Sequence, residues 1–349
     1  MNNRNDLPRV TVLMPVYNGE KFLGEAIESI LEQTFKDFEF LIIDDGSTDD
    51  SRKIVESFSD SRIRYIRQSN HRSIAHVLNK GISLSQGVLI ARMDCDDISL
   101  PTRIEKQVDY FNKNPKTGAL GTNVIIIDDQ GNFLSHKSRP ISYLSNRWIS
   151  LFKPPLMHPT VMYAKKIIKQ YDGYKEDAIP AEDFDLWSRL IETVKCEQLE
   201  EVLVILRSHD GSVSNSRRTD QIEKTREISM NNIRNFSAGS LHQEEIISIQ
   251  NHLTHKTGNA KPSYNDYYNF LKLYMLFCNK TRGILSKRDI KFISNHCLNV
   301  VVGLFTLTLR EQFGIVQSVC LSRTVPTEFK CLIIEAFLRR IKAKYLIRR

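Results

Sequence analysis

Disulfide frameworks and cysteine-based metal motifs are absent from this sequence. The six cysteines, from Cys95 to Cys331, are far apart and form no CxxC pair and no Cys/His cluster with zinc spacing. We therefore expect reduced thiols in a cytosolic protein.

Long hydrophobic runs are also missing. Residues 1–8 are polar and lack the apolar stretch of a secretory signal, so we expect no export signal. The longest apolar run, residues 297–309, is interrupted by Asn299 and Gly303 and is shorter than the ~20 residues that span a bilayer. The sequence predicts no transmembrane helix.

No glycine-rich GxGxxG motif follows the first apolar run, which disfavours a dinucleotide-dependent oxidoreductase. Hydrophobic residues make up 41% and charged residues 26% of the chain, as in ordinary globular proteins. The net charge of +8 favours anionic partners, namely nucleic acid, phosphorylated substrates or an anionic lipid surface. Because the basic residues are spread along the chain without a recognition motif, we expect no specific nucleic-acid partner.

Apolar runs and amphipathic segments alternate over the first part of the chain. The runs at residues 10–14 and 38–43 flank a helical pattern and form a βαβ unit. Further strands are predicted at 63–66, 88–93 and 119–127, with helices opening near Ser47 and Asp49 and at 74–84 and 101–112. This order predicts an α/β fold with a mostly parallel central sheet and a ligand site beyond the carboxyl ends of its strands.

Polar clusters follow three of these strands, at residues 15–18, 44–47 and 94–97. The third contains Asp94 and Asp96, a DxD motif directly after a strand. Two carboxylates at this spacing can share Mg²⁺ or Mn²⁺ with a diphosphate, since these cations take carboxylate and phosphate oxygens together. The alternative interpretation is an acidic turn or helix cap without metal.

Four ordered motifs carry a closer resemblance: PVYNGE at 15–20, SILEQTF at 29–35, IIDDGSTD at 42–49 and ARMDCDD at 91–97 followed by Pro101 and Arg103. Together they resemble the family 2 glycosyltransferases of the GT-A (nucleotide-diphospho-sugar transferase) fold, in register to about residue 210. The resemblance implies transfer of a sugar from a nucleotide-diphosphate-sugar donor to an acceptor hydroxyl, with Mn²⁺ or Mg²⁺ as cofactor. It also implies a role in bacterial cell-surface polysaccharide biosynthesis, such as capsule or O-antigen.

The resemblance assigns the donor site to residues after the first, second and fourth predicted strands. Asp45 is expected to accept a hydrogen bond from the nucleotide base, Asp94 to lie near the ribose and diphosphate and also at the metal, and Asp96 to hold the metal. The base pocket is completed by a loop that contains Pro15, Tyr17, Asn18 and Glu20. For residues 44–47 the alternative is a plain turn with a helix cap.

Glu182 and Asp183 resemble the acidic motif of the same family. An inverting transfer, which the resemblance implies, needs a carboxylate that takes the proton of the acceptor hydroxyl. Asp183 is the predicted base, and Glu182 is predicted to hold the acceptor or share that role. Acidic residues also suit a helix N-terminus on electrostatic grounds alone.

Three further residues are implied by the resemblance. Arg207 is expected near the diphosphate, His209 as a third metal ligand and His158 on the acceptor side. The alternatives are a structural histidine at position 209 and a rigid turn before a strand at position 158.

The chain changes character beyond residue 215, where helical patterns replace the alternation. We predict a GT-A domain at 1–215 and a helical C-terminal region at 216–349 that binds acceptor or a membrane surface. A helix that opens at Pro326 has an apolar side with Phe329 and Ile333 and a basic end at residues 339–349. This pattern favours peripheral attachment to the anionic cytoplasmic face of a membrane and a lipid-linked glycan acceptor, or a packing helix with a solvated tail.

Other function classes remain to be weighed. A nucleotidyltransferase also uses paired carboxylates and metal, but it would release pyrophosphate instead of a nucleoside diphosphate. A sugar-nucleotide-binding protein would bind donor without turnover. A glycosidase, with two opposed carboxyl groups, is disfavoured by the ordered motifs before Asp94.

Overall fold

The computed structural model describes residues 7–209, 211, 218–254 and 263–301, and short pieces between 315 and 334. The chain divides into two compact units, Met1–Thr225 and Arg226–Arg349. The boundary falls inside helix α9 (Arg218–Ser237), ten residues beyond the predicted one. The separate roles predicted for residues 1–215 and 216–349 stay predictions.

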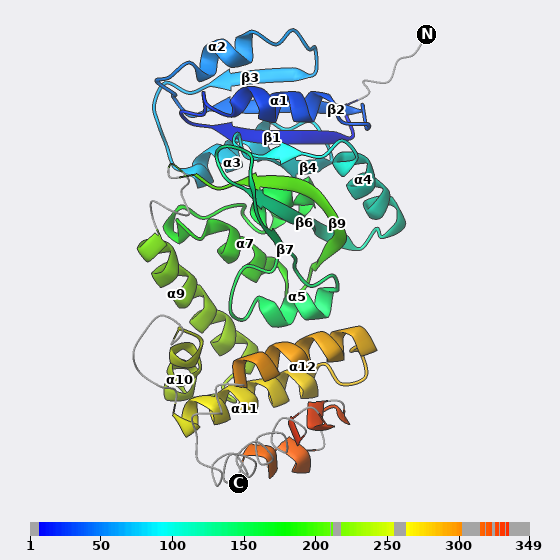
Figure 1. Cartoon of the computed structure of the whole chain (residues 1–349), viewed down its shortest axis with the longest axis vertical. Helices are drawn as coiled ribbons and strands as arrows, with labels where there is room; N and C mark the ends of the chain where they lie inside the picture. The colour runs from blue at the N-terminus through cyan, green and yellow to red at the C-terminus, as the bar shows by residue number, and fades with distance from the viewer. Residues whose placement is uncertain are drawn as a thin grey trace. The chain divides into compact units, whose positions relative to one another are not determined.

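The first unit is built on one curled, mixed sheet, which has nine strands within the described residues (Figure 1). The strand order is β3-β2-β1-β4-β8-β6-β9-β5, and β7 pairs with β6 outside this path. The strands are β1 (Val10–Val16), β2 (Phe38–Asp44), β3 (Ile63–Arg67), β4 (Leu89–Arg92), β5 (Ile98–Ser99), β6 (Thr117–Ile127), β7 (Phe133–Lys137), β8 (Met162–Ala164) and β9 (Lys195–Arg207).

Most strands of this sheet point the same way. The pairs β1–β2, β2–β3, β1–β4 and β6–β9 are parallel. Strand β8 lies antiparallel between β4 and β6, so β6 and β9 keep the direction of β1 to β4. Only β5, β7 and β8 run the other way among the described strands. The predicted α/β fold with a mostly parallel sheet is confirmed.

Helices connect the strands and cover both faces of the sheet. In the first unit they are α1 (Leu23–Leu31), α2 (Ser51–Glu56), α3 (Ile74–Leu84), α4 (Arg103–Lys113), α5 (Tyr143–Ile149), α6 (Lys165–Gln170), α7 (Glu182–Leu190) and the 3₁₀ turns η1 (His158–Thr160) and η2 (Glu176–Ala178). Because side chains alternate along a strand, two apolar layers form. Val12 and Met14 of β1 pack with α1 and α4, whereas Leu13 packs with α3 and α7.

Two predicted boundaries are wrong by a few residues. Strand β1 continues through Pro15 to Val16 instead of ending before the proline. Its pairing with β4 ends at Leu13. No residue of β4 therefore lies opposite Pro15 to accept the hydrogen bond that proline cannot donate. Helix α2 begins at Ser51 and not near Ser47, because residues 44–50 form hydrogen-bonded turns with the loop after β1.

The second unit is helical in its described part, as predicted. Its helices are the remainder of α9, α10 (Gln243–Thr254), α11 (Tyr264–Lys280) and α12 (Lys287–Val301). Ser263 and Asp266 form a capping box at the start of α11. Phe329 is buried and its ring centroid lies 4.5 Å from that of Tyr274, and Ile333 is buried too.

Burial of those two residues favours a packing role for the described part of the predicted C-terminal helix. The basic residues 339–349 lie outside the described residues, so membrane attachment stays a prediction. Among the helices that the structure describes, none combines the length and apolar character needed to cross a bilayer.

Candidate active site

The loop after β1 and the turn after β2 meet at the carboxyl edge of the sheet. The exposed ring of Tyr17 stacks on His71, with ring centroids 3.9 Å apart. The buried carboxylate of Asp45 accepts hydrogen bonds from the backbone N–H of Arg72 at 3.0 and 3.1 Å and from Gln68 Nε2 at 2.6 Å. His71 Nδ1 lies 2.8 Å from Asp45 Oδ2. Tyr17 and Asp45, both predicted to line the pocket of the nucleotide base, therefore both contact His71.

Asn18 and Glu20 connect this loop to the start of α2. The backbone of Asn18 is left-handed, with φ at 50°, and its Oδ1 accepts a hydrogen bond from the Thr48 N–H at 2.9 Å. Glu20 Oε2 accepts from the Asp50 N–H at 2.9 Å. Pro15 is buried inside β1. These contacts orient the loop, and a direct contact of Pro15, Asn18 or Glu20 with substrate stays a prediction.

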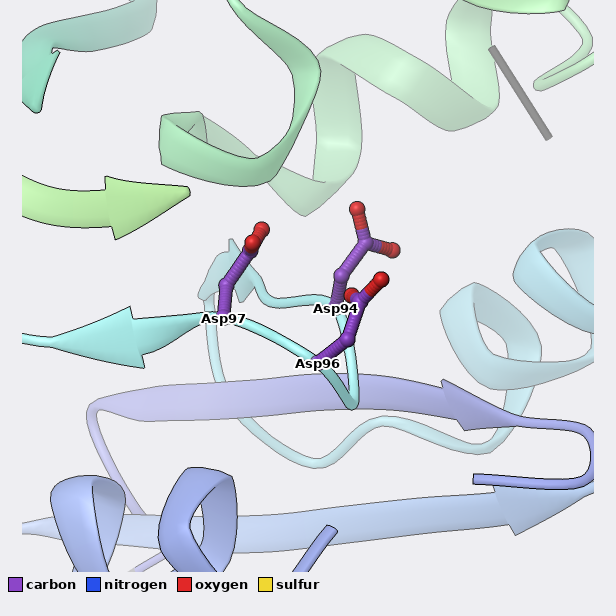
Figure 2. A group of neighbouring side chains, drawn as sticks. All are labelled: Asp94, Asp96 and Asp97. Atoms are coloured by element: carbon purple, nitrogen blue, oxygen red, sulfur yellow. The ribbon is translucent and has the colours of Figure 1, made fainter. Parts of the chain in front are cut away.

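Asp94, Asp96 and Asp97 on the turn after β4 form what we call the aspartate cluster. Carboxylate oxygens, one from each, all lie within 4.8 Å of one another. Figure 2 shows the three side chains on the same side of the turn. A Cβ at Gly19 would lie 3.0 Å from Cys95 Sγ, so glycine lets the loop after β1 approach this turn closely. The DxD aspartates are thus brought together, and Asp97 joins them.

Arg92, buried at the end of β4, forms an ion pair with Asp94. Burial raises the pKa of Asp94; Arg92 opposes this effect, and the charges of Asp96 and Asp183 add to it. Burial, together with Asp94 and Asp96, raises the pKa of Asp97 well above its usual range. The carboxylates of Asp94 and Asp97 are therefore destabilised as anions, which a bound divalent cation would relieve.

Arg207, the last residue of β9, and His209, two residues later, both contact this cluster. Arg207 Nη2 pairs with Glu25 at 2.5 Å, its Nε donates to the Asp96 carbonyl at 3.2 Å, and its guanidinium lies 4.5 Å from the Phe22 ring centroid. His209 Nε2 lies 2.9 Å from Asp96 Oδ2. His209 is thus a neighbour of the cluster. Its role as a metal ligand and that of Arg207 at the diphosphate stay predictions.

Glu182 and Asp183 are the first two residues of α7. Asp183 Oδ1 accepts a hydrogen bond from the Phe184 N–H at 2.7 Å. Burial raises the pKa of Asp183, although that N–H and Arg92 oppose the rise. Burial and the charge of Asp183 raise the pKa of Glu182 to about 7. Since Asp183 also raises the pKa of Asp94, the N-terminus of α7 interacts electrostatically with the aspartate cluster, although Glu182 lies 85 residues beyond Asp97 in sequence.

His158 lies inside the first unit. Its Nε2 is 2.8 Å from the Tyr174 hydroxyl, and its ring packs edge-on near Trp187, with centroids 6.3 Å apart. Burial lowers the pKa of His158 well below its usual value, so its imidazole is neutral. These contacts fix a core position, and a contact with acceptor stays a prediction.

Sequence reasoning assigned no role to Arg92, Asp97, His71 or Gln68. A charged residue inside the apolar run 88–93 was a signal for Arg92, because a buried cation requires an anionic partner. His71 and Gln68 lie in a polar stretch without periodicity, so nothing in the sequence pattern distinguished them.

The first half of the chain matches the model of the family described as Glycosyl transferase family 2, over residues 11–172. The chain is 34% identical over 193 residues to the putative glycosyltransferase EpsE of Bacillus subtilis. That alignment covers 54% of this chain and 68% of EpsE. It is 33% identical over 219 residues to the O-antigen biosynthesis glycosyltransferase WbnJ of Escherichia coli. That alignment covers 60% of this chain and 84% of WbnJ.

The fold is similar to a solved structure, that of S. aureus TarS 1-349 in complex with UDP-GlcNAc. The TM-score is 0.57 at 16% identity, and the alignment covers 84% of this chain and 89% of the other. At this identity the likeness concerns the fold.

Proposed function

This chain belongs to glycosyl transferase family 2 and is a glycosyltransferase of the GT-A fold, and from that premise we propose that it transfers a sugar from a nucleotide-diphosphate-sugar donor to an acceptor hydroxyl with inversion at the anomeric carbon. One observation carries the proposal: Asp183 at the N-terminus of α7, 89 residues beyond Asp94 in sequence, is near enough to the aspartate cluster to raise the pKa of Asp94.

The aspartate cluster fits a divalent cation, Mn²⁺ or Mg²⁺. Its ligand atoms are hard oxygens within 4.8 Å of one another, and their burial raises the pKa values of Asp94 and Asp97. Asp94 and Asp96 would hold the ion, with His209 as the third proposed ligand. When bound, the cation neutralises charge on the departing diphosphate.

Asp183 is the proposed base. Its carboxylate takes the proton of the acceptor hydroxyl while that oxygen attacks the anomeric carbon on the side opposite the diphosphate, so the new glycosidic bond has inverted configuration. Glu182, whose pKa is raised to about 7, lies beside it and holds the acceptor or shares the proton.

Donor binding is assigned to residues of the loop after β1 and the turn after β2. In the proposal the nucleotide base packs on Tyr17 and donates a ring N–H to Asp45. Because the carboxylate of Asp45 already contacts His71 and Gln68, the base would take over one of these contacts. Arg207 adjoins the diphosphate, and Pro15, Asn18 and Glu20 shape the loop.

The acceptor is proposed to be a glycan or lipid-linked glycan of a cell-surface polysaccharide. The name of the E. coli relative, an O-antigen biosynthesis glycosyltransferase, supports this class. In the same proposal residues 216–349 bind acceptor or the membrane, His158 supports the acceptor side, and the enzyme works in the cytoplasm or peripherally on the cytoplasmic face of the membrane.

Thermal unfolding with UDP-, GDP-, TDP- and CMP-sugars, each with and without Mn²⁺, tests the proposal, because a ligand of the native state raises its apparent stability. We expect a manganese-dependent rise with one nucleotide, and release of that nucleoside diphosphate on turnover. Release of pyrophosphate would indicate a nucleotidyltransferase instead. A donor-dependent rise without any turnover would indicate a binding protein, and a product with retained anomeric configuration would rule out the Asp183 mechanism.

A further inference from the structure

His71, in the loop between β3 and α3, makes two contacts that the proposed function assigns to the nucleotide base. Its imidazole stacks on Tyr17, with ring centroids 3.9 Å apart and the ring planes at 27°. Its Nδ1 lies 2.8 Å from Asp45 Oδ2. A base that packs on Tyr17 and donates a ring N–H to Asp45 presents the same combination of a flat ring and a ring nitrogen. The imidazole and the base therefore need the same partners.

The other partners of Asp45 are held in place by the protein. Gln68 donates from Nε2 to Asp45 Oδ1 at 2.6 Å, and Lys80 donates to Gln68 Oε1 at 3.1 Å, which fixes the orientation of the amide. The backbone N–H of Arg72 donates to both carboxylate oxygens. The side chain of His71, by contrast, is 55% exposed. Of these contacts to Asp45, that of His71 is the one a ligand can replace at the lowest cost.

The backbone beside His71 does not need to move for this replacement. Gly46, with φ at 80°, approaches the loop so closely that a Cβ there would lie 3.1 Å from His71 N. This approach and the hydrogen bonds from Arg72 to Asp45 hold the loop against the turn after β2. Exposed side chains change rotamer on the picosecond-to-nanosecond timescale. Rotation of the His71 side chain alone would therefore release both Asp45 Oδ2 and the ring of Tyr17.

We propose that His71 and the nucleotide base of the donor compete for one position, so that donor binding displaces the imidazole from Tyr17 and Asp45. The inference rests on the proposed function, because that function assigns these two residues to the base. A ligand that binds only one conformation has its affinity reduced by the fraction of protein in that conformation. His71 therefore weakens donor binding, although it lies inside the donor site.

Isothermal titration calorimetry of the full-length protein with UDP, GDP, TDP and CDP in Mn²⁺ tests the inference. We expect His71→Ala to bind the preferred nucleotide at least about threefold more tightly than the wild type, because the variant has no imidazole to displace. His76→Ala is the matched control. His76 lies five residues further along the chain, on α3 and beside Glu176, and its replacement should leave the affinity unchanged.

A second measurement follows the histidine in the wild-type protein. With ¹³C-labelled histidine, the NMR signal of the His71 ring is assigned by its loss in His71→Ala. On saturation with the preferred nucleotide in Mg²⁺ this signal should move, because the imidazole leaves the face of Tyr17. The signal of His76 should stay where it is.

Unchanged or weaker nucleotide binding by His71→Ala would overturn the inference and leave the proposed function intact, because His71 would then be neutral or a part of the pocket. A His71 signal that stays in place at saturation would overturn it as well. If neither the wild type nor His71→Ala binds any of the four nucleotides, the proposed function fails together with the inference.

Discussion

Replacement of Glu182 by glutamine is expected to stabilise the metal-free protein at pH 8 and to leave its stability unchanged at low pH. Burial and the charge of Asp183 raise the pKa of Glu182 from 4.5 to about 7 in the folded protein. Between these two values the folded state binds more protons than the unfolded state, so the free energy of unfolding falls as pH rises through this window. Because glutamine does not titrate, the variant does not lose this part of its free energy of unfolding as pH rises.

The size of the effect follows from the shift. One pKa unit corresponds to about 1.4 kcal/mol, so the displacement from 4.5 to about 7 costs the wild type roughly 3 kcal/mol above pH 7. Part of that cost is repulsion shared with Asp183, which titrates together with Glu182. We therefore expect Glu182→Gln to raise the free energy of unfolding by about 2 kcal/mol at pH 8.

Urea unfolding in EDTA at pH 5 and pH 8 measures this difference. Trp148 and Trp187, the two tryptophans of the chain, are both buried in the first unit, so their fluorescence reports on the unit that contains Glu182. Glu28→Gln on the exposed side of α1 is the matched control and should change stability by less than about 0.5 kcal/mol at either pH. Equal stabilities of the wild type and Glu182→Gln at pH 8, or a similar gain at pH 5, would refute the reasoning.

The other predictions concern the cation, the base and the core histidine. Asp96→Asn should lower nucleoside diphosphate release at least about 100-fold with the fold intact, and near-normal turnover would remove the metal assignment. Stabilisation by Mn²⁺ should decrease as pH falls, because burial raises the pKa of Asp94 and ligands must deprotonate; thermal shifts that do not depend on pH would contradict this. Asp183→Asn should slow transfer by about 10²–10⁴-fold with donor affinity unchanged. His158→Ala should lower the free energy of unfolding by about 2–4 kcal/mol and raise the acceptor KM, and an unchanged KM in a folded variant would leave His158 with a structural role alone.

The first half of the fold was predictable because burial on both faces makes its strands continuous apolar runs. Helix α3 lies at the predicted residues, 74–84, and β2 and β6 differ from their predictions by one or two residues. The second half was not predictable in this way. Strand β9 begins with the charged stretch KCEQLEE, and β8 has three residues. Strand β8 pairs with β4 and β6, and β9 pairs with β6 and β5, so both depend on partners far away in sequence and not on a local pattern.

The residues of the site likewise fall into a part that the strand pattern predicts and a part that it does not. Convergence of Asp45 with Asp94 and Asp96 follows from parallel strands that end at one edge. The approach of Asp183 came from the resemblance, since α7 follows an irregular segment whose path depends on tertiary packing. The sequence alone could not distinguish side chains that would contact substrate from those that hold the loops, as Asn18 and Glu20 do here.

The local charge of the site explains why a cation belongs to the proposed function although the chain as a whole carries +8. The aspartate cluster and the α7 pair contribute five carboxyl groups, and the buried cations beside the cluster include Arg92, Arg103 and Arg207, of which Arg207 already pairs with Glu25. A diphosphate that entered such a site alone would meet net repulsion, whatever the charge on distant surfaces, because screening limits those charges to about 8–10 Å in solution. A divalent ion held by the aspartate cluster reverses that local balance. Donor affinity and metal affinity should therefore be coupled in this enzyme, each raising the other by the same factor.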